Sequence, residues 1–421
     1  MSSAKLRWLI AGTLLLSTTI NYADRVTLSV LIPSIEKDLH LNSVDYAQIV
    51  SVFLFSYAAM YAVSGYLVDR WGPRRSLTVF SLVWSVSQML HAFARGKLSL
   101  AGARFSLGAA EPGNFPAAVS AIREWFPVEQ RALGIGVFNA GSSLGAALAP
   151  PLAGLVALRF GWRAAFLVTG GLGLAWLGLW RFVYHSVDTH PWLSTKDRKR
   201  AHCVAEIEPP IKINWLALLQ NPACLLLMLS RFLTDPVIYF VIFWLPTYLS
   251  TSRGFDLAMI ARYAWMPYIF GDVGYIFGGW LSGEMIRRGW TVAAARRFAF
   301  CLGAAMLPAA IFAPHARTID QLIAAMCVVV LGHSIWVANI LTLPADIFDQ
   351  QSVGTVSGLA GMAGSVGGIL TTLAIGYLSM QASYNGVFMV AGLLHPLAAV
   401  LLAIFLTQRY FPRLLRDPLA P

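Results

Sequence analysis

Ionisable side chains interrupt the apolar stretches of this chain at several points. The stretch "INYADR" places Asp24 and Arg25 side by side between "WLIAGTLLLST" and "VTLSVLIP". Arg104 and Glu111 stand in another apolar stretch, close to two helical turns apart, and Tyr22 is nearly one turn from Arg25, so we expect each pair to share a helix face. Arginine can hold an anionic carboxylate through a bidentate pair, whereas a partly buried carboxylate can carry a proton. These residue types therefore suggest anion binding together with proton transfer.

The elements that carry these residues are predicted to lie in lipid. Of 421 residues, 57% are hydrophobic and only 12% are charged, whereas soluble proteins carry roughly 25% charged residues. Apolar runs of about 20 residues, long enough to cross a bilayer, recur along nearly the whole chain. We predict an all-α membrane protein with twelve transmembrane helices in two pseudo-symmetric six-helix bundles. The predicted spans are 8–33, 46–68, 76–94, 98–122, 131–157, 163–184, 222–250, 260–283, 298–314, 319–343, 352–379 and 386–407.

Charges inside such helices need an explanation. An ionisable group near the bilayer centre costs about 2.5–3.5 kcal/mol on insertion scales, so each one indicates a function or an internal partner. In the alternative to anion binding, Asp24 pairs with Arg25 and Arg104 pairs with Glu111, and the four residues only neutralise one another. Three more charges fall in predicted helices, the first two as an expected structural pair: Arg231, Asp235 and Asp272.

The positive charges predict how the chain is oriented. Most Lys and Arg residues fall in the N-terminus, the even-numbered loops and the C-terminus, so both termini are predicted to be cytoplasmic. The first apolar run continues past residue 30 without a small-x-small cleavage site, so we expect it to be retained. The net charge of +11 is spread over short loops, which argues against a nucleic-acid partner. Four cysteines without metal-ligand spacing predict no metal.

The chain divides near its middle. Residues 186–214 form the only long polar segment, so we predict an N-terminal bundle over 1–185, a cytoplasmic linker over 186–214 and a C-terminal bundle over 215–421. The chain also repeats itself, since "FPVEQRALGIGVFNAGSSLGAALAP" lies over "FDQQSVGTVSGLAGMAGSVGGILTT", which matches Phe126 with Phe348. Two six-helix halves related by duplication indicate a transporter with its substrate between the halves near the bilayer midplane.

The segment "GYLVDRWGPRR" follows the second predicted helix and is echoed by "GGWLSGEMIRRGW" after the eighth. It resembles, position by position, the loop between helices two and three of the major facilitator superfamily, where this loop acts as a latch in alternating access. We expect glycines to permit close packing and a tight turn, and the aspartate to form ion pairs with basic residues. In the alternative, the arginines are only orientation charges. The predicted gating residues are Gly65, Asp69, Arg70, Gly72, Arg74 and Arg75.

Several longer segments resemble one branch of that superfamily, the anion:cation symporters, and above all bacterial hexuronate permeases. The resemblance covers almost the whole chain and is carried by "INYADRVTLSVLIPSIEKDL", "RFSLGAAEPGNFPAAVSAIREWFPVEQRALGIGVFNAGSSLGAALAPPL", "SRFLTDPVIYFVIFWLPTYL", "AWMPYIFGDVGYIFGGWL" and "GLAGMAGSVGGIL". It implies proton-coupled import of a small organic anion by alternating access, with the proton as coupling ion and no other cofactor. It also implies that the chain is not an enzyme.

The resemblance assigns roles residue by residue. It makes Arg25 and Arg104 carboxylate ligands, Asp24 and Glu111 proton sites, and Tyr22 and Tyr57 substrate contacts. Galactonate-type permeases have a Gln in helix five where this chain has Ser142, and an Asn in helix eleven where it has Gly361. These departures favour another sugar acid, such as a hexuronate. Some hexuronate permeases lack the aspartate in helix one, so the number of coupled protons stays open.

A sugar acid also carries hydroxyl groups, which other residues must recognise. Aromatic faces pack against sugar carbons, while Asn, His, Ser and Thr bind hydroxyls. Candidates at helical spacing are Asn139 and Ser142 in the fifth predicted helix, and His333, Trp336, Asn339 and Thr342 in the tenth. The alternative for each is ordinary helix packing.

Two other functions remain in view. An exchanger or uniporter for other organic anions would use the same charges, whereas a membrane enzyme or receptor would need a metal cluster, a nucleophile motif or a signalling domain. None of these appears in the chain. We expect a monomer whose partners are a small carboxylate substrate and the lipid bilayer.

Overall fold

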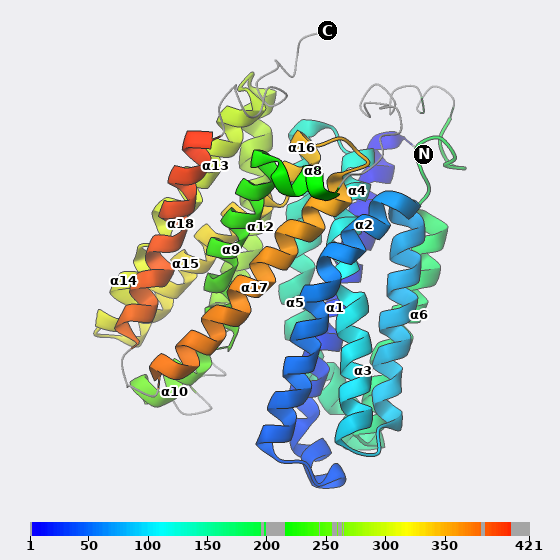
Figure 1. The fold of residues 1–421 in the computed structure, drawn as a ribbon, viewed down its shortest axis with the longest axis vertical. Coiled ribbons are helices and arrows are strands. Elements are labelled where there is room, and N and C mark those ends of the chain that lie inside the picture. The colour runs from blue at the N-terminus through cyan, green and yellow to red at the C-terminus, as the bar shows by residue number, and fades with distance from the viewer. Residues whose placement is uncertain are drawn as a thin grey trace. The chain divides into compact units, whose positions relative to one another are not determined.

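The computed structural model describes residues 2–194, 198, 215–243, 245–254, 259, 263, 265–379 and 384–405. Within these residues the regular secondary structure is helical throughout, as Figure 1 shows. The predicted all-α fold is therefore confirmed for the described chain. Eight of its helical segments are long and apolar enough to cross a membrane.

The first part of the chain contains six α-helices and two short 3-10 turns. They are α1 (Ser3–Leu39), α2 (Ser43–Leu90), η1 (His91–Phe93), α3 (Lys97–Ala110), η2 (Glu111–Gly113), α4 (Asn114–Trp125), α5 (Val128–Phe160) and α6 (Trp162–Val183).

Three of the predicted spans in the first part of the chain do not correspond to single straight helices. The second and third spans run together in α2, which is interrupted at Gly72, where φ is +76°. Glycine tolerates this left-handed backbone because it has no Cβ. The fourth span is divided into α3, η2 and α4 at Pro112, since proline lacks the N–H that would continue the helix ladder.

The second part of the chain is built from helices of more varied length. They are α8 (Trp215–Gln220), α9 (Pro222–Phe243), α10 (Leu245–Arg253), α12 (Met266–Arg287), α13 (Val292–Met306), α14 (Ala309–Phe312), η3 (Ala313–His315), α15 (Ile319–Ile340), α16 (Leu343–Ile347), α17 (Val353–Ser379) and α18 (Asn385–Phe405).

The chain forms two compact units. Unit 1 comprises Met1–Pro127, Val137–Lys212 and Phe348–Leu359, and unit 2 comprises Val128–Gly136, Ile213–Ile347 and Ala360–Pro421. The first part of α5, Val128–Gly136, thus belongs to unit 2, and the rest of α5 belongs to unit 1. The start of α17, up to Leu359, belongs to unit 1, and the rest of α17 belongs to unit 2. Most of the predicted linker 186–214 lies outside the described residues, so the domain boundaries proposed from the sequence stay a prediction.

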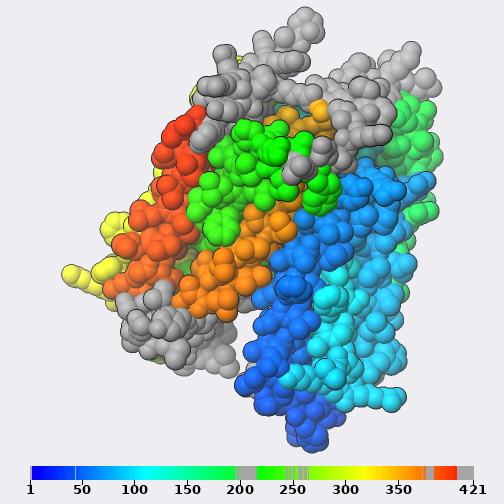
Figure 2. Space-filling model, viewed as in Figure 1, coloured from blue at the N-terminus to red at the C-terminus, as the bar shows by residue number. Residues whose placement is uncertain are grey.

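Packing within unit 1 surrounds the predicted charged residues with helices. Helix α2 lies along α3, and α6 packs against α1 and α2. Figure 2 shows that side chains close the space between the ribbons of α2 and α3. Buried apolar residues of α1, α2, α3 and α6, among them Leu31, Ile49, Leu100 and Phe166, form a core at one end of this unit.

Candidate functional site

The structure brings the predicted charged residues of unit 1 together, with a different pairing from the one that sequence spacing suggests. The Nε and Nη2 atoms of Arg25 donate hydrogen bonds of 3.0 and 2.8 Å to one carboxylate oxygen of Glu111. The side chain of Glu111 is fully buried, whereas that of Arg25 is 24% exposed. Arg25 is therefore an arginine that is already paired and still accessible from one side.

Aromatic rings surround the Arg25 guanidinium. Its carbon lies 4.7 Å from the ring centroid of Tyr22 on the same helix and 4.7 Å from that of Tyr57 on α2. The ring of Phe53 lies 5.5 Å away. A cation over ring faces is stabilised by about 0.5–2 kcal/mol, more when water is excluded. Tyr22 and Tyr57 thus line the guanidinium, their role as substrate contacts stays a prediction, and Phe53 is a third ring that the sequence did not single out.

Arg104 lies beside this pair without joining it. One of its Nη atoms donates a 3.1 Å hydrogen bond to the backbone oxygen of Arg25, and the residue is 4% exposed. Among the described residues no carboxylate lies within 4.0 Å of its guanidinium. The alternative pairing of Arg104 with Glu111 is wrong, because Glu111 begins the turn η2 and reaches across to α1.

Asp24 occupies a closed environment. It is fully buried, and within the described chain neither of its carboxylate oxygens makes a hydrogen bond of standard geometry. Its backbone oxygen accepts a 3.3 Å bond from Gln88, whose amide also donates to Thr169 at 2.9 Å. The alternative pairing of Asp24 with Arg25 is also wrong, since neighbours on a helix point about 100° apart. Gln88 was missed, although a glutamine in the apolar run "WSVSQML" is itself a signal.

The two candidates on α5 also belong to unit 1. Asn139 is 4% exposed, and the Ser142 hydroxyl donates a 2.7 Å hydrogen bond to its backbone oxygen. Asn139 keeps a side-chain nitrogen that is buried and unpartnered in the described structure. Their role in binding substrate stays a prediction.

The predicted gating segment makes specific contacts within unit 1. The two carboxylate oxygens of Asp69 accept hydrogen bonds from the backbone N–H groups of Gly354 (2.7 Å) and Thr355 (2.5 Å), in the first turn of α17. A carboxylate is stabilised there by the helix dipole and by free N–H groups. The prediction that Asp69 forms ion pairs is wrong for the described residues, because none of their basic side chains lies within 4.0 Å of the Asp69 carboxylate.

The other predicted gating residues have distinct surroundings. Arg74 donates to the backbone oxygen of Arg181 and contacts the His185 ring, each at 2.9 Å, whereas Arg70 and Arg75 are exposed. Gly65 packs so closely on α17 that a Cβ there would meet the backbone oxygen of Gly354 at 2.2 Å. The close packing expected of this glycine is thus present, and the gating role itself stays a prediction.

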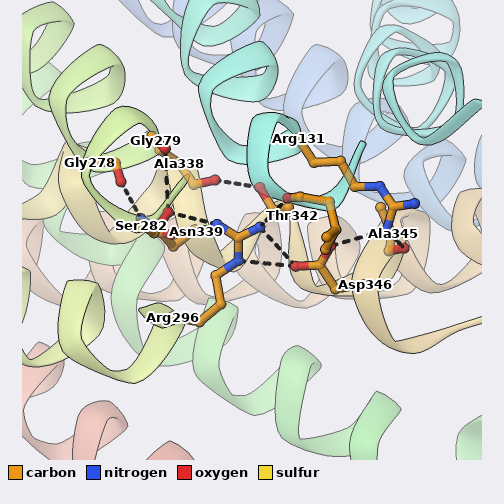
Figure 3. A network of polar contacts seen from close by, with 11 residues as sticks. Arg131, Gly278, Gly279, Ser282, Arg296, Ala338, Asn339, Thr342, Ala345 and Asp346 are labelled. Atoms are coloured by element: carbon orange, nitrogen blue, oxygen red, sulfur yellow. Dashed lines mark hydrogen bonds and ion pairs between the residues drawn. The ribbon is translucent and has the colours of Figure 1, made fainter. Parts of the chain in front are cut away.

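In unit 2, the predicted sugar-binding stripe on α15 is engaged by protein groups. The amide oxygen of Asn339 accepts from Arg296 at 3.2 Å, and its amide nitrogen donates to the backbone oxygens of Gly278 (3.2 Å) and Ile335 (2.9 Å). The Thr342 hydroxyl donates to Ala338. Figure 3 shows Asn339 and Thr342 inside this network. These partners account for Asn339 and Thr342 as packing residues, and their role in binding substrate stays a prediction.

In the same network, two arginines share one carboxylate. The fully buried Arg296 donates to one carboxylate oxygen of Asp346 at 3.0 Å, and Arg131 donates to the other at 3.3 Å (Figure 3). Arg296 also donates to the Ser282 hydroxyl at 2.7 Å. One carboxylate thus holds two arginines from α5 and α13, which joins several helices of unit 2 at a single point.

The remaining candidates of α15 pack against α18. His333 and His395 are buried and their rings are hydrogen bonded, with 3.1 Å between Nδ1 of the first and Nε2 of the second. Trp336 is fully buried, with its ring centroid 4.7 Å from that of Phe300. Both residues thus have protein partners in unit 2, and their role in binding substrate stays a prediction.

Arg231 and Asp235 form the structural ion pair that was expected on α9. The closest contact, between Arg231 Nη2 and Asp235 Oδ2, is 2.6 Å, and two further hydrogen bonds join the same side chains. The two residues are one helical turn apart, which lets the long arginine side chain reach the carboxylate.

An all-helical chain with membrane-length helices and a buried charge cluster defines a polytopic membrane protein. The chain belongs to the Major Facilitator Superfamily, whose family model matches residues 14–372. This superfamily consists of transporters rather than enzymes, and its fold comprises twelve membrane spans. Spans and helices differ in number at two places. Helix α2, which is interrupted at Gly72, covers two predicted spans, whereas α3, η2 and α4 together cover one.

Relatives extend over nearly the whole chain. It is 29% identical to the hexuronate transporter of Escherichia coli K12, over 94% of this chain and 93% of that protein. It is 32% identical to a probable sulfoacetate transporter of Cupriavidus necator, over 93% and 91% of the two chains. The crystal structure of a human organic anion transporter is similar in fold, with a TM-score of 0.72, 15% identity and coverage of 94% and 99%. The resemblance to hexuronate permeases is therefore confirmed.

Proposed function

We propose that this protein is a secondary active transporter that imports a small organic anion together with protons by alternating access. The substrate we propose is a hexuronate or a related sugar acid. The observation that carries the proposal is the contact between Arg25 and Glu111, an accessible arginine held by a buried carboxylate between two tyrosine rings. The similarity to a hexuronate transporter and to a probable sulfoacetate transporter, both for organic anions, supports the same class of substrate.

The geometry supports coupling through competition for one guanidinium. Glu111 and a substrate carboxylate are both acceptors for the same N–H groups of Arg25, so they exclude each other there. A proton that neutralises Glu111 weakens its hold on Arg25, because bonds between charged groups are roughly twice as strong as neutral ones. Proton binding then favours substrate binding, and release of either favours release of the other.

Arg104 supplies a second cation for the substrate. It is buried and has no carboxylate partner among the described residues, while its backbone contact to Arg25 holds it next to the first guanidinium. Two adjacent arginines of which only one is neutralised attract an anion. We propose Arg25 and Arg104 as carboxylate ligands, Tyr22 and Tyr57 as contacts for the sugar carbons, and Glu111 as the principal proton site. Asp24 remains a predicted second proton site.

A second candidate function uses the same residues without proton coupling. An organic-anion exchanger or uniporter needs cationic side chains but no carboxylate that competes for them. The Arg25–Glu111 contact favours the coupled importer over this alternative. The proposed location is a bacterial inner membrane with both termini in the cytoplasm, in line with the distribution of Lys and Arg.

Proteoliposomes distinguish these functions. Vesicles that contain a pH indicator and no anion receive external galacturonate or glucuronate. A proton-coupled importer acidifies the lumen as substrate enters, a uniporter takes up substrate without acidification, and an exchanger takes up none until the lumen holds an anion. A thermal-shift screen with galacturonate, glucuronate, galactonate, glucarate and sialic acid identifies the substrate to use.

A further inference from the structure

The carboxylate that pairs with Arg25 stands at a break in a helix. Helix α3 ends at Ala110, Glu111 opens the 3-10 turn η2, and α4 begins at Asn114. Pro112 in this turn lacks the backbone N–H that would bond one turn back, which accounts for the end of the regular ladder. The 3-10 turn has weaker hydrogen bonds than an α-helix, so it holds its backbone less firmly. Other contacts are therefore needed to fix the direction of the Glu111 side chain.

Asn114 attaches this break to the helix that carries Arg25. Its side-chain oxygen accepts a 2.7 Å hydrogen bond from the Ser17 hydroxyl, and its nitrogen donates a 3.0 Å bond to the Thr18 hydroxyl. Asn114, Ser17 and Thr18 are all fully buried. Both ends of one amide are therefore satisfied by neighbouring residues of α1, in surroundings where an unsatisfied polar group costs several kcal/mol.

The internal repeat provides a comparison within the same chain. The alignment that places Phe126 on Phe348 also places Glu111 to Asn114 on the stretch 333–336, which reads His-Ser-Ile-Trp. There α15 continues without a break from Ile319 to Ile340. The copy that lacks proline and asparagine at these positions is a regular helix. The break and its attachment thus belong to the half that holds the Arg25–Glu111 pair.

We infer that Asn114 is a positioning residue for transport, which holds Glu111 against Arg25 by fastening the helix break to α1. Arg25 lies two turns beyond Ser17 on α1, and Glu111 lies one turn before Asn114 on the other chain segment. The hydrogen bonds of Asn114 to α1 therefore set the position of Glu111 relative to Arg25. An error of about 1 Å in such a site lowers rates by roughly a hundredfold in enzymes. The inference rests on the proposed function, since it assigns Asn114 to the same coupling site.

Three variants separate positioning from stability. Asn114→Leu removes both hydrogen bonds at similar side-chain size, and Thr18→Val removes one of them. Thr27→Val is the matched control, because Thr27 is also a fully buried threonine of α1, and its hydroxyl donates a 2.8 Å bond within its own helix, to Ala23. Thr18 makes the corresponding bond to Leu14 at 3.3 Å, so the two valine variants differ mainly in the contact with Asn114.

The measurement is the ratio of proton-driven accumulation to counterflow exchange in proteoliposomes, with each corrected for the amount of folded transporter. We expect Asn114→Leu to lower this ratio at least tenfold and Thr18→Val to lower it severalfold, while Thr27→Val leaves it unchanged. The pH dependence of exchange should shift in Asn114→Leu in the same direction as in Glu111→Gln.

Other results overturn the inference. If accumulation and exchange fall in proportion, or if the ratio stays at the wild-type value, Asn114 only stabilises the fold. If the wild type accumulates no substrate under an imposed pH gradient, the proposed function fails, and substrate affinity in a thermal-shift titration becomes the test. A tenfold loss of affinity in Asn114→Leu, absent in Thr27→Val, then still assigns Asn114 to the placement of Arg25, and equal affinities refute it.

Discussion

Replacing Glu111 by glutamine tests whether this carboxylate competes with substrate for Arg25. The change keeps the size and one acceptor oxygen but removes the charge. Two hydrogen bonds of 3.0 and 2.8 Å join Arg25 to a single Glu111 oxygen. Bonds to charged groups contribute about 1.5–3 kcal/mol and neutral ones about 0.5–1.5 kcal/mol, so the substitution weakens the hold on Arg25 by about 1–2 kcal/mol.

This difference predicts a measurable change in substrate binding. Freed of a charged competitor, Arg25 should bind the substrate about tenfold more tightly at pH 8 in Glu111→Gln than in the wild type, since 1.4 kcal/mol is a factor of ten. Binding should also lose most of its pH dependence. Calorimetric titration of purified protein at several pH values measures both effects. Proton-driven accumulation should be abolished, while counterflow exchange partly survives.

The reasoning is refuted by two results. If Glu111→Gln binds substrate as weakly at pH 8 as the wild type does, Glu111 does not compete for Arg25. If the variant still accumulates substrate at the wild-type level, the proton is carried elsewhere, and Asp24 becomes the residue to test. Substitution of Glu284, a carboxylate on α12 paired with Arg287 and Arg288, is the control for loss of a charge outside this site.

Three further predictions concern single residues. Arg104→Ala should abolish measurable substrate binding while the thermal midpoint stays close to that of the wild type; near-normal affinity in the same titration would show that Arg104 has only a structural role. Asp346→Asn should lower the free energy of unfolding by about 3–5 kcal/mol, because two arginines of the described network lose their charged partner in the interior. In the same denaturation experiment, Glu284→Gln at an exposed ion pair should have a small effect. Burial, and then the charges of His185 and Arg74, lower the pKa of His190, so the folded protein favours the neutral ring. This contribution to stability is complete above about pH 6.5, and the thermal midpoint should fall as the pH drops below that value. A His190→Gln variant with the same pH dependence as the wild type would contradict this.

Composition and periodicity were sufficient to determine the fold class. The high apolar fraction, the recurring runs of membrane length and the loop motif with Gly65 and Gly72 all arise from local sequence, so they indicate helices and family directly. The same holds for the pair of Arg231 and Asp235, which are one turn apart on a single helix. Contacts within one helix can be read from spacing alone.

Contacts between helices depended on the tertiary structure. Spacing pairs Arg104 with Glu111 along one helix, but the break at Pro112 turns Glu111 toward Arg25 on α1. Asn339 has the spacing of a sugar ligand, yet its partners come from Arg296 and from the backbone of α12.

The types of residue in the site were therefore evident from the sequence, and their partners were not. A helix face is set by a period of 3.6 residues, which the sequence contains. Which other helix meets that face, and at what height, depends on the packing of side chains from distant parts of the chain. Only the tertiary structure decides that Glu111 holds Arg25 and leaves Arg104 without a carboxylate in the described chain.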